Sequence, residues 1–391
     1  MKLAIVRKTY NPFGGAERYL DLLSRALAER GHEVHVFANR WPREASSPVA
    51  FHRIPMVGGL SVLKVWSFAV AAWARLRRFD GQVFSNERLF AQDVFRAPDG
   101  VHRTWLRTRR RHVSRLKRVS MLINPLHWSV RFFDWYIFNR RAFRAVIVAS
   151  EFVKHDILRT YPRVRAEDVT VVYNGVDLAR FRVRTPEECE ASRRELGLAA
   201  SQWVLLFIGT GFERKGLRYA IGALAHLPPE VILLVVGRGS TRRYQALARA
   251  LGIADRVRFD GPQSQVERYY AAADLLVLPA LYEPMGNVIL EALASGVPVV
   301  TSRASGGAEI VSEGEDGSVI EDPADARAVA AHLTKVMSWA RDPATARRAR
   351  LKAERFGLDR ALAETLAVLS RVHAGTSDGS RDADRMTRAH G

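Results

Sequence analysis

The sequence predicts an α/β protein built from two doubly wound parallel sheets. Short apolar segments alternate with helical segments along most of the 391 residues, which is the pattern of parallel strands covered by helices on both faces. The length allows two ordinary domains, each with its own core. A strong turn signal at Asn174-Gly175 divides the alternation into two halves.

The first half is expected to form one of these sheets. A strand at 3–6 is followed by a turn-rich loop with Gly14 and Gly15, and the helix expected over 16–29 ends at Gly31, a natural C-cap position. The loop lacks the six-residue glycine fingerprint of dinucleotide-binding proteins, so no such cofactor is expected. Further strands are expected at 33–37, 51–54, 82–84, 145–149 and 169–173, and helices at 60–79 and 151–160.

The second half repeats the alternation more regularly. The sequence predicts domains over 1–174 and 175–349, followed by a terminal helix at about 350–372. The end of the chain is polar and offers no core residues, so disorder is expected over 374–391. Strands are expected at 203–208, 231–236, 257–259, 275–278, 297–300 and 318–320, and helices at 216–227, 242–251, 265–272, 287–294 and 325–339.

The composition restricts the possible partners and compartment. A net charge of +19 implies an acidic partner, which can be nucleic acid, an anionic membrane surface or a phosphorylated substrate. The single cysteine, Cys189, excludes an intrachain disulfide and a cysteine metal site and favours a reducing compartment. Residues 1–7 contain too few apolar side chains for a secretory signal, so a cytoplasmic protein is expected. Basic residues interrupt the helix at 60–79, which is therefore too short to span a membrane.

The segment 282–300 has the features of a nucleotide-sugar site. It follows a buried strand, and Gly286, which has no Cβ, lets a ligand approach the backbone. The free N–H groups of Gly286, Asn287 and Val288 open the next helix. Such a helix end receives an anion, for which a diphosphate is the obvious candidate.

Two carboxylates, Glu283 and Glu291, frame the start of this helix. Because acids repel a diphosphate, they are expected to accept hydrogen bonds from hydroxyl groups, Glu283 from the transferred sugar and Glu291 from the ribose. The alternative is that Glu291 complements the helix dipole and that Glu283 is a solvated loop charge.

The loop 209–216 follows the first strand of the second half, and parallel sheets bind ligands at this end of their strands. Arg214 can direct two donors at phosphate oxygens, while Lys215 adds a compact charge. Together they can neutralise a leaving diphosphate, so no metal cofactor is expected. Arg238 follows the next strand, in a loop that is expected to border the nucleotide base, although Arg238 is equally consistent with a surface charge.

These motifs resemble a known family. Glu283, Pro, an apolar residue and Gly, with Glu291 eight positions after the first and Val-Pro-Val-Val beyond, are similar to the signature of the retaining glycosyltransferases of family 4. Members of that family have the GT-B fold, in which two Rossmann-like domains face each other across a cleft. The resemblance implies that the last helix crosses back onto the first domain.

The resemblance also implies roles for individual residues. The first domain binds the acceptor and the second binds the nucleotide sugar, with an Arg and a Lys of the 209–216 loop on the donor phosphates. Gly14 and Gly15 match the paired glycines that lie against the diphosphate. Gln263, after the third strand of the second half, matches the place where members contact the base through main-chain groups. Met285 and Asn287 stand where members often have Phe and Leu, so the fit of the donor sugar is not fixed by the resemblance.

The segment 86–102 resembles the glucosyltransferases that extend the lipopolysaccharide core, in which an Asp occupies the place of Asp99. Asp99 is a candidate catalytic base or acceptor anchor. Because it lies between Pro and Gly, an ordinary turn aspartate is the alternative. His102 is another candidate proton acceptor by its intrinsic pKa.

The segment 103–118 contains eight Lys or Arg and no acid. Leu106, Val113 and Leu116 can share one helical face, which leaves the basic residues for anionic lipid or for acceptor phosphates. A nucleic-acid surface and a solvated loop are the alternatives, but no nucleic-acid-binding module is visible, so nucleic acid is not expected as a partner. The candidate acceptor or membrane residues are Arg103, Arg107, Arg109, Arg110, Arg111 and Lys117.

The sequence therefore predicts a hexosyltransferase with a nucleotide-sugar donor, UDP-dependent, and a phosphorylated lipid-linked acceptor at the cytoplasmic face of the inner membrane. A nucleotide-sugar 2-epimerase of the same fold remains an alternative. A glycogen-type phosphorylase is a weaker one, because no pyridoxal lysine is evident. In a different class, a non-enzymatic basic protein that binds nucleic acid or membranes would not depend on Glu283 or Lys215.

Overall fold

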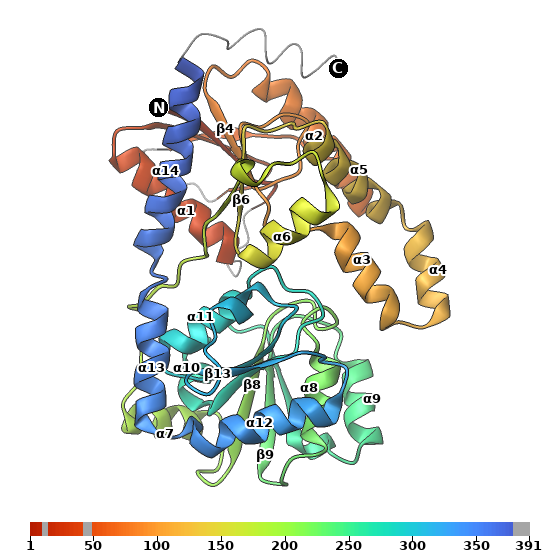
Figure 1. The fold of residues 1–391 in the computed structure, drawn as a ribbon, viewed down its shortest axis with the longest axis vertical. Coiled ribbons are helices and arrows are strands. Elements are labelled where there is room, and N and C mark those ends of the chain that lie inside the picture. The colour runs from red at the N-terminus through yellow and green to blue at the C-terminus, as the bar shows by residue number, and fades with distance from the viewer. Residues whose placement is uncertain (10–14, 42–48, 378–391) are drawn as a thin grey trace. The chain divides into compact units, whose positions relative to one another are not determined.

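A computed structural model describes residues 1–9, 15–41 and 49–377, which form two compact units with one parallel sheet in each (Figure 1). Unit 1 comprises Met1–Tyr173 and Leu362–Gly391, and unit 2 comprises Asn174–Ala361. The chain passes from unit 1 to unit 2 beside the Asn174-Gly175 turn. It returns within the last helix.

Unit 1 is built on a seven-stranded sheet in the order β3-β2-β1-β4-β5-β6-β7, with every pair of neighbours parallel. The strand order reverses between β1 and β4. Open α/β sheets bind ligands at the carboxyl ends of the strands beside such a reversal. The strands are β1 (Lys2–Val6), β2 (Glu33–Ala38), β3 (Ala50–Arg53), β4 (Gln82–Ser85), β5 (Val94–Arg96), β6 (Ala145–Val148) and β7 (Val169–Val171).

Helices bury their apolar stripes against this sheet. Phe68 and Leu76 of α2 pack with Val83 of β4 in one core cluster, while α5 and α6 contribute to a second cluster around Phe95 of β5. Helix α14 belongs to this unit from Leu362 onward, and its Thr365 hydroxyl lies 2.6 Å from that of Tyr19 on α1. The helices are α1 (Gly15–Glu29), α2 (Ser61–Leu76), α3 (His102–Arg111), α4 (Arg115–Ile123), α5 (Pro125–Asn139), α6 (Glu151–Thr160) and α14 (Leu358–Ser377).

Unit 2 contains a six-stranded parallel sheet in the order β10-β9-β8-β11-β12-β13, and its strand order reverses between β8 and β11. The strands are β8 (Trp203–Ile208), β9 (Val231–Val236), β10 (Val257–Gly261), β11 (Leu275–Leu278), β12 (Val299–Ser302) and β13 (Gly317–Ile320). The helices are α7 (Pro186–Glu195), α8 (Leu217–Leu224), α9 (Arg242–Ala250), α10 (Glu267–Ala272), α11 (Asn287–Ala294), α12 (Ala326–Ala340) and α13 (Pro343–Glu354).

Two helix predictions were wrong. The basic segment 103–118 is not one helix, because the chain breaks after α3 and Ser114, in an extended conformation, caps α4 by accepting the backbone N–H of Lys117. The terminal helix predicted at 350–372 is likewise two helices, α13 and α14, separated at 355–357. Helix α14 continues to Ser377, so the disorder predicted from 374 is wrong for 374–377, and residues 378–391 lie outside the described part.

Candidate functional site

The strand-order reversal of unit 2 brings together the loops 209–216, after β8, and 279–286, after β11. The two loops touch at Gly216, which has a left-handed φ of 81°, and a Cβ placed there would lie 1.8 Å from the carbonyl oxygen of Pro279. A backbone hydrogen bond of 2.8 Å from the N–H of Leu281 to the carbonyl of Arg214 also joins them. Only glycine allows this approach, so the two sequence motifs form one site.

Three predicted residues meet in this site. The carboxylate of Glu283 lies 2.7 Å from Lys215 Nζ and 3.1 Å from Arg214 Nη1. The Arg214 guanidinium also donates to the carbonyl of Tyr282 at 3.1 Å. Glu283 is only 6% exposed and Lys215 is also buried, so the cluster holds both cations in fixed positions.

The charges of this cluster favour an anionic ligand. Burial alone would raise the pKa of Glu283, but the Lys215 and Arg214 charges outweigh burial and hold that pKa below its ordinary value. The carboxylate therefore stays ionised at neutral pH. Two cations against one carboxylate leave one positive charge in excess, at the strand ends where a parallel sheet binds ligands.

The start of α11 adds backbone donors to the same loop. Gly286, with φ of 75°, precedes the helix, and no side chain caps it. Gly286 itself offers no side-chain acceptor to the N–H groups of the first turn, such as those of Asn287 and Val288, which makes the helix end suitable for an anion. Met285 is buried before it, and the Asn287 side chain accepts a hydrogen bond of 2.5 Å from Asn174.

Glu291 lies further along α11 and has a different environment from Glu283. Its Oε2 accepts a hydrogen bond of 2.7 Å from the Tyr270 hydroxyl. Burial raises the pKa of Glu291, and the hydrogen bond from Tyr270 only partly opposes that effect. The two glutamates predicted to share one site are thus an ionised group between two cations and a more weakly acidic group bound to a tyrosine.

Two other predicted donor residues, Arg238 and Gln263, lie in the loops that follow β9 and β10. Arg238 is exposed after β9 and makes no ion pair with the described residues. Gln263 donates to the carbonyl of Asp260 at 2.8 Å and accepts from Arg268 at 3.1 Å. Gly14 lies outside the described residues, and Gly15 is the first residue of α1.

In unit 1, Asp99 lies in a turn after β5, before Gly100 with φ of 65°. The turn expected of a Pro-Asp-Gly sequence therefore forms. The Asp99 side chain is 74% exposed, and its Oδ2 lies 3.2 Å from Arg88 Nη1. His102 begins α3, and its Nε2 is 3.1 Å from Nδ1 of His127. Burial and the Arg88 charge lower the pKa of His102 to about 3, so this histidine is neutral and weakly basic at neutral pH.

Comparison with known proteins identifies the family. The family model of glycosyl transferases group 1 matches residues 189–354, and that of glycosyltransferase family 4 matches 13–180. D-inositol 3-phosphate glycosyltransferase of Xylanimonas cellulosilytica is 30% identical over an alignment of 402 positions, which covers 92% of each chain. The chain belongs to glycosyltransferase family 4.

Two further similarities describe this glycosyltransferase. The lipopolysaccharide glucosyltransferase WaaG of Escherichia coli K12 is 28% identical over 331 residues, covering 83% of this chain and 86% of WaaG. A crystal structure of WaaG superposes with a TM-score of 0.80 at 25% identity, over 94% of this chain and 99% of the other. HepE of Anabaena, crystallised with UDP and glucose, has a TM-score of 0.72 at 22% identity over 95% and 100% of the two chains. The two sheet units are therefore those of the GT-B fold.

The glycosyltransferase carries its predicted basic residues on α3 and α4, where Arg103, Arg107, Arg110 and Arg111 are exposed and Arg109 and Lys117 are partly buried. Arg109 lies over the Trp105 ring, 5.8 Å from its centroid. Of the exposed apolar residues in this region, only Leu116 was identified from the sequence. Leu116 is 86% exposed and Ile123 74%, with Val119, Leu122 and Trp128 also exposed. No helix of the described residues is long and apolar enough to cross a membrane.

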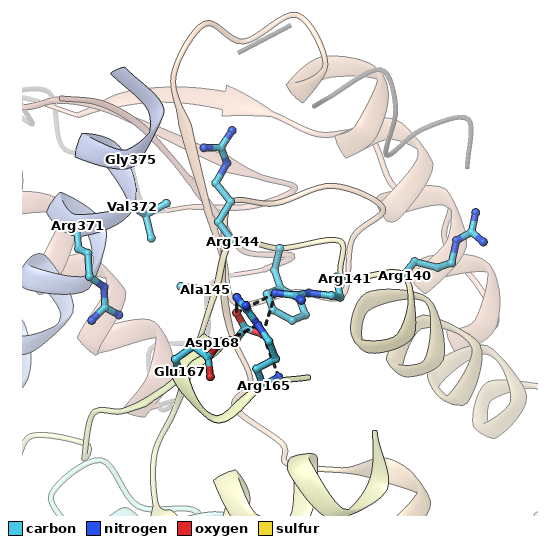
Figure 2. A pocket seen from close by; sticks show the side chains of 11 residues that line it. Arg140, Arg141, Arg144, Ala145, Arg165, Glu167, Asp168, Arg371, Val372 and Gly375 are labelled. Carbon is cyan, nitrogen blue, oxygen red and sulfur yellow. Dashed lines mark hydrogen bonds and ion pairs between the residues drawn. The ribbon is translucent and has the colours of Figure 1, made fainter. Parts of the chain in front are cut away.

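A cavity of about 550 Å³ lies at the amino ends of two strands of the unit 1 sheet, beside the starts of β6 and β7 (Figure 2). Five arginines line it, and in Figure 2 Arg141 and Arg165 both turn toward Asp168. None of the predicted site residues lines this cavity. Among the residues that the structure describes, no group of three or more His, Cys, Asp or Glu side chains is arranged to hold a metal ion.

Proposed function

We propose that this glycosyltransferase transfers a hexose from a nucleotide sugar, UDP-glucose or a similar donor, to a phosphorylated lipid-linked oligosaccharide such as the lipopolysaccharide core. The observation that carries the donor half is the Arg214, Lys215 and Glu283 cluster beside the uncapped start of α11. The similarity to WaaG supports the acceptor class, as does that to the lipopolysaccharide core glycosyltransferase LpsE of Rhizobium meliloti, 37% identical over 147 residues that cover 37% of this chain and 43% of LpsE.

The cations and the helix end have complementary tasks in this proposal. When the bond from the sugar to the diphosphate breaks, negative charge develops on the leaving phosphate, and preorganised donors stabilise that charge. Arg214 and Lys215 are already fixed by Glu283, so they need not reorganise during the reaction. Gly286, Asn287 and Val288 would direct backbone dipoles at the same phosphates.

Glu283 keeps acceptor capacity for the sugar. Each carboxylate oxygen has two lone pairs, and each oxygen of Glu283 contacts one cation. The remaining lone pairs can accept hydrogen bonds from hydroxyl groups of the transferred sugar. Glu291 would accept from the ribose, while Arg238 and Gln263 would border the base.

The acceptor half rests on Asp99 at the carboxyl end of β5. Its exposed carboxylate would anchor the acceptor hydroxyl or take its proton. In a retaining transfer the acceptor oxygen bonds to the anomeric carbon on the face that the phosphate leaves. The leaving diphosphate can then receive the hydroxyl proton, in which case Asp99 orients the acceptor. No metal is assigned a role in these steps.

The surface of α3 and α4 suits an anionic membrane. Basic side chains of α3 lie next in the chain to exposed apolar residues of α4, a combination that binds the interface through headgroup charge and acyl contact. We place the enzyme as a peripheral protein on the cytoplasmic face of the inner membrane, where a lipid-linked acceptor is accessible.

The donor proposal is tested with a panel of nucleotide sugars and a truncated lipopolysaccharide acceptor. Thermal shifts identify the donor that binds, and chromatography of the products measures transfer. Arg214→Ala should lower kcat by at least about 100-fold because it removes charge stabilisation of the leaving group. Arg218→Ala is the matched control, since Arg218 is exposed and is the second residue of α8.

Equal turnover in the two arginine variants would contradict the donor site. Epimerised nucleotide sugar formed without an acceptor would identify the 2-epimerase instead.

For the membrane proposal, the Leu116→Ser, Ile123→Ser double variant should sediment with anionic vesicles at least about tenfold more weakly than the wild type. The double variant Leu251→Ser, Leu351→Ser, which also removes exposed leucines, should bind normally. Unchanged binding by the α4 variant would rule out that surface.

A further inference from the structure

The strongest unassigned feature beside the acceptor half is a buried charge network behind Asp99. Asp134 on α5 is 1% exposed. Its Oδ1 accepts from Arg88 Nε at 2.6 Å, and its Oδ2 accepts the backbone N–H of His102 at 3.3 Å. The same Arg88 side chain extends in the other direction to Oδ2 of Asp99, 3.2 Å from Nη1. One guanidinium thus joins a buried carboxylate to an exposed one.

We infer that Arg88, fixed by Asp134, is the positioning residue that holds the Asp99 carboxylate toward the acceptor hydroxyl. This inference rests on the proposed function. A guanidinium is planar and presents several donors in fixed directions, so anchoring Nε on a buried group also fixes where Nη1 points. Lysine, with one rotatable ammonium group, cannot hold two carboxylates in this way.

The placement of the network supports a role at the ligand edge of the sheet. Arg88 follows β4 and Asp99 follows β5, so both lie at carboxyl ends of strands. The preceding residue, Glu87, faces the other way and contacts Arg7 at 3.2 Å and Lys8 at 3.6 Å, at the end of β1. Adjacent strands are about 4.8 Å apart, so the ends of β1 and β5 are about 10 Å apart, a span that a phosphorylated monosaccharide can bridge.

The buried part of the network also has a local purpose that must be separated from this role. No side chain of its own segment caps α3, and Asp134 supplies an anionic acceptor at its first N–H, which favours the helix electrostatically. Burial opposes the Arg88 charge, but the Asp134 and Asp99 carboxylates outweigh burial and raise the pKa of Arg88 above its ordinary value. Removing Asp134 would therefore disturb both the helix and the buried cation.

The test is a double-mutant cycle that leaves Asp134 intact. Arg88→Lys keeps a cation beside Asp134 but loses the contact with Asp99, and Asp99→Asn removes the carboxylate. Each variant should lower kcat/KM for the acceptor by about tenfold with the KM of the donor unchanged. If Arg88 acts through Asp99, kcat/KM of the double variant should be no lower than that of the less active single variant.

Arg144→Lys is the matched control, because Arg144 is also partly buried and pairs with Asp93 at 3.4 Å. It lies at the amino end of β6, whereas Arg88 and Asp99 lie at carboxyl ends of strands. It should retain wild-type kcat/KM. Effects of Arg88→Lys and Asp99→Asn that multiply to about 100-fold, or wild-type activity in either one, would overturn the positioning role. A wild-type enzyme that transfers no sugar would instead overturn the proposed function and this inference with it.

Discussion

At the scale of single residues, Gly216 is the position at which the donor site is most sensitive to added volume. Its φ of 81° disfavours any side chain, and a Cβ would lie 1.8 Å from the Pro279 carbonyl oxygen. Gly216→Ala must therefore push apart the loops that carry Arg214, Lys215 and Glu283. We expect a loss of stability of at least about 2 kcal/mol and loss of nucleotide-sugar binding, measured by urea denaturation and by calorimetry.

Gly211→Ala separates the steric effect from the backbone effect in this prediction. Gly211 is in the same loop and has a similar φ of 75°, but a Cβ there meets nothing within 4 Å. We expect a cost of about 1 kcal/mol from the left-handed backbone alone and retained donor binding. If both alanine variants behave alike, the contact between the two loops does not organise the site.

The same residues show what the sequence could reveal. Arg214, Lys215 and Glu283 each lie in a recognisable strand-end motif, so their placement at the same end of the sheet could be predicted from the α/β pattern. The Arg88 and Asp134 pair could not, because 46 positions separate the two residues and neither belongs to a repeating pattern. The direct contact of Glu283 with Arg214 and Lys215 was not predicted either, because Glu283 was expected to bind a hydroxyl group of the sugar and not a cation.

At the scale of elements, α7 is held by a capping box. The Thr185 side chain accepts the backbone N–H of Glu188, and the Glu188 carboxylate accepts that of Thr185. Thr185→Ala should destabilise unit 2 by about 1 kcal/mol, whereas Thr185→Ser, which keeps the hydroxyl, should cost less than half of this. Urea denaturation measures both variants, and equal loss in the two would show that the hydroxyl does not cap the helix.

The predictability of the elements follows the strength of their local signals. Long apolar strands such as β8 and β9 could be placed to the residue. Helix α7 was missed although its Thr-Pro-Glu-Glu start is a standard helix signal, because its polar composition indicates no buried face. The strand β5 has three residues and is defined by its neighbours in the sheet. The break between α3 and α4 depends on one capping serine, which a charge pattern does not reveal.

At the scale of the whole molecule, acid should destabilise this enzyme. Among the described carboxyl groups, nine have pKa values below their ordinary values and three have values above, and Glu283 and Asp168 are buried members of the larger group. For Asp168, burial would raise the pKa, but hydrogen bonds from Arg165 and the Arg141 charge lower it. A carboxyl group with a lowered folded-state pKa contributes stability above its unfolded pKa of about 4, and that contribution is lost as the pH falls through the folded value.

The net charge of +19 acts in the same direction. Each carboxylate that is protonated adds to an existing positive excess, and self-repulsion of the compact state grows. The three carboxyl groups with raised pKa values, Asp134, Glu291 and Asp316, oppose this change, because their burial as charges becomes less costly in acid. Their opposing effect is complete once the pH has fallen to about 4, whereas the groups with lowered pKa values lose their contribution below that pH, so we expect the free energy of unfolding to fall between about pH 4 and about pH 2.

Urea denaturation at a series of pH values measures this fall, and Asp168→Asn tests its origin in unit 1. The amide cannot ionise, so the variant should be less stable near neutral pH and should lose less on acidification. A wild-type stability that stays constant or rises between about pH 4 and about pH 2 would mean that the paired carboxylates do not stabilise the fold. Comparing the wild type with Asp168→Asn thus measures whether the arginines stabilise the fold by pairing with carboxylates or only destabilise it by repulsion between positive charges.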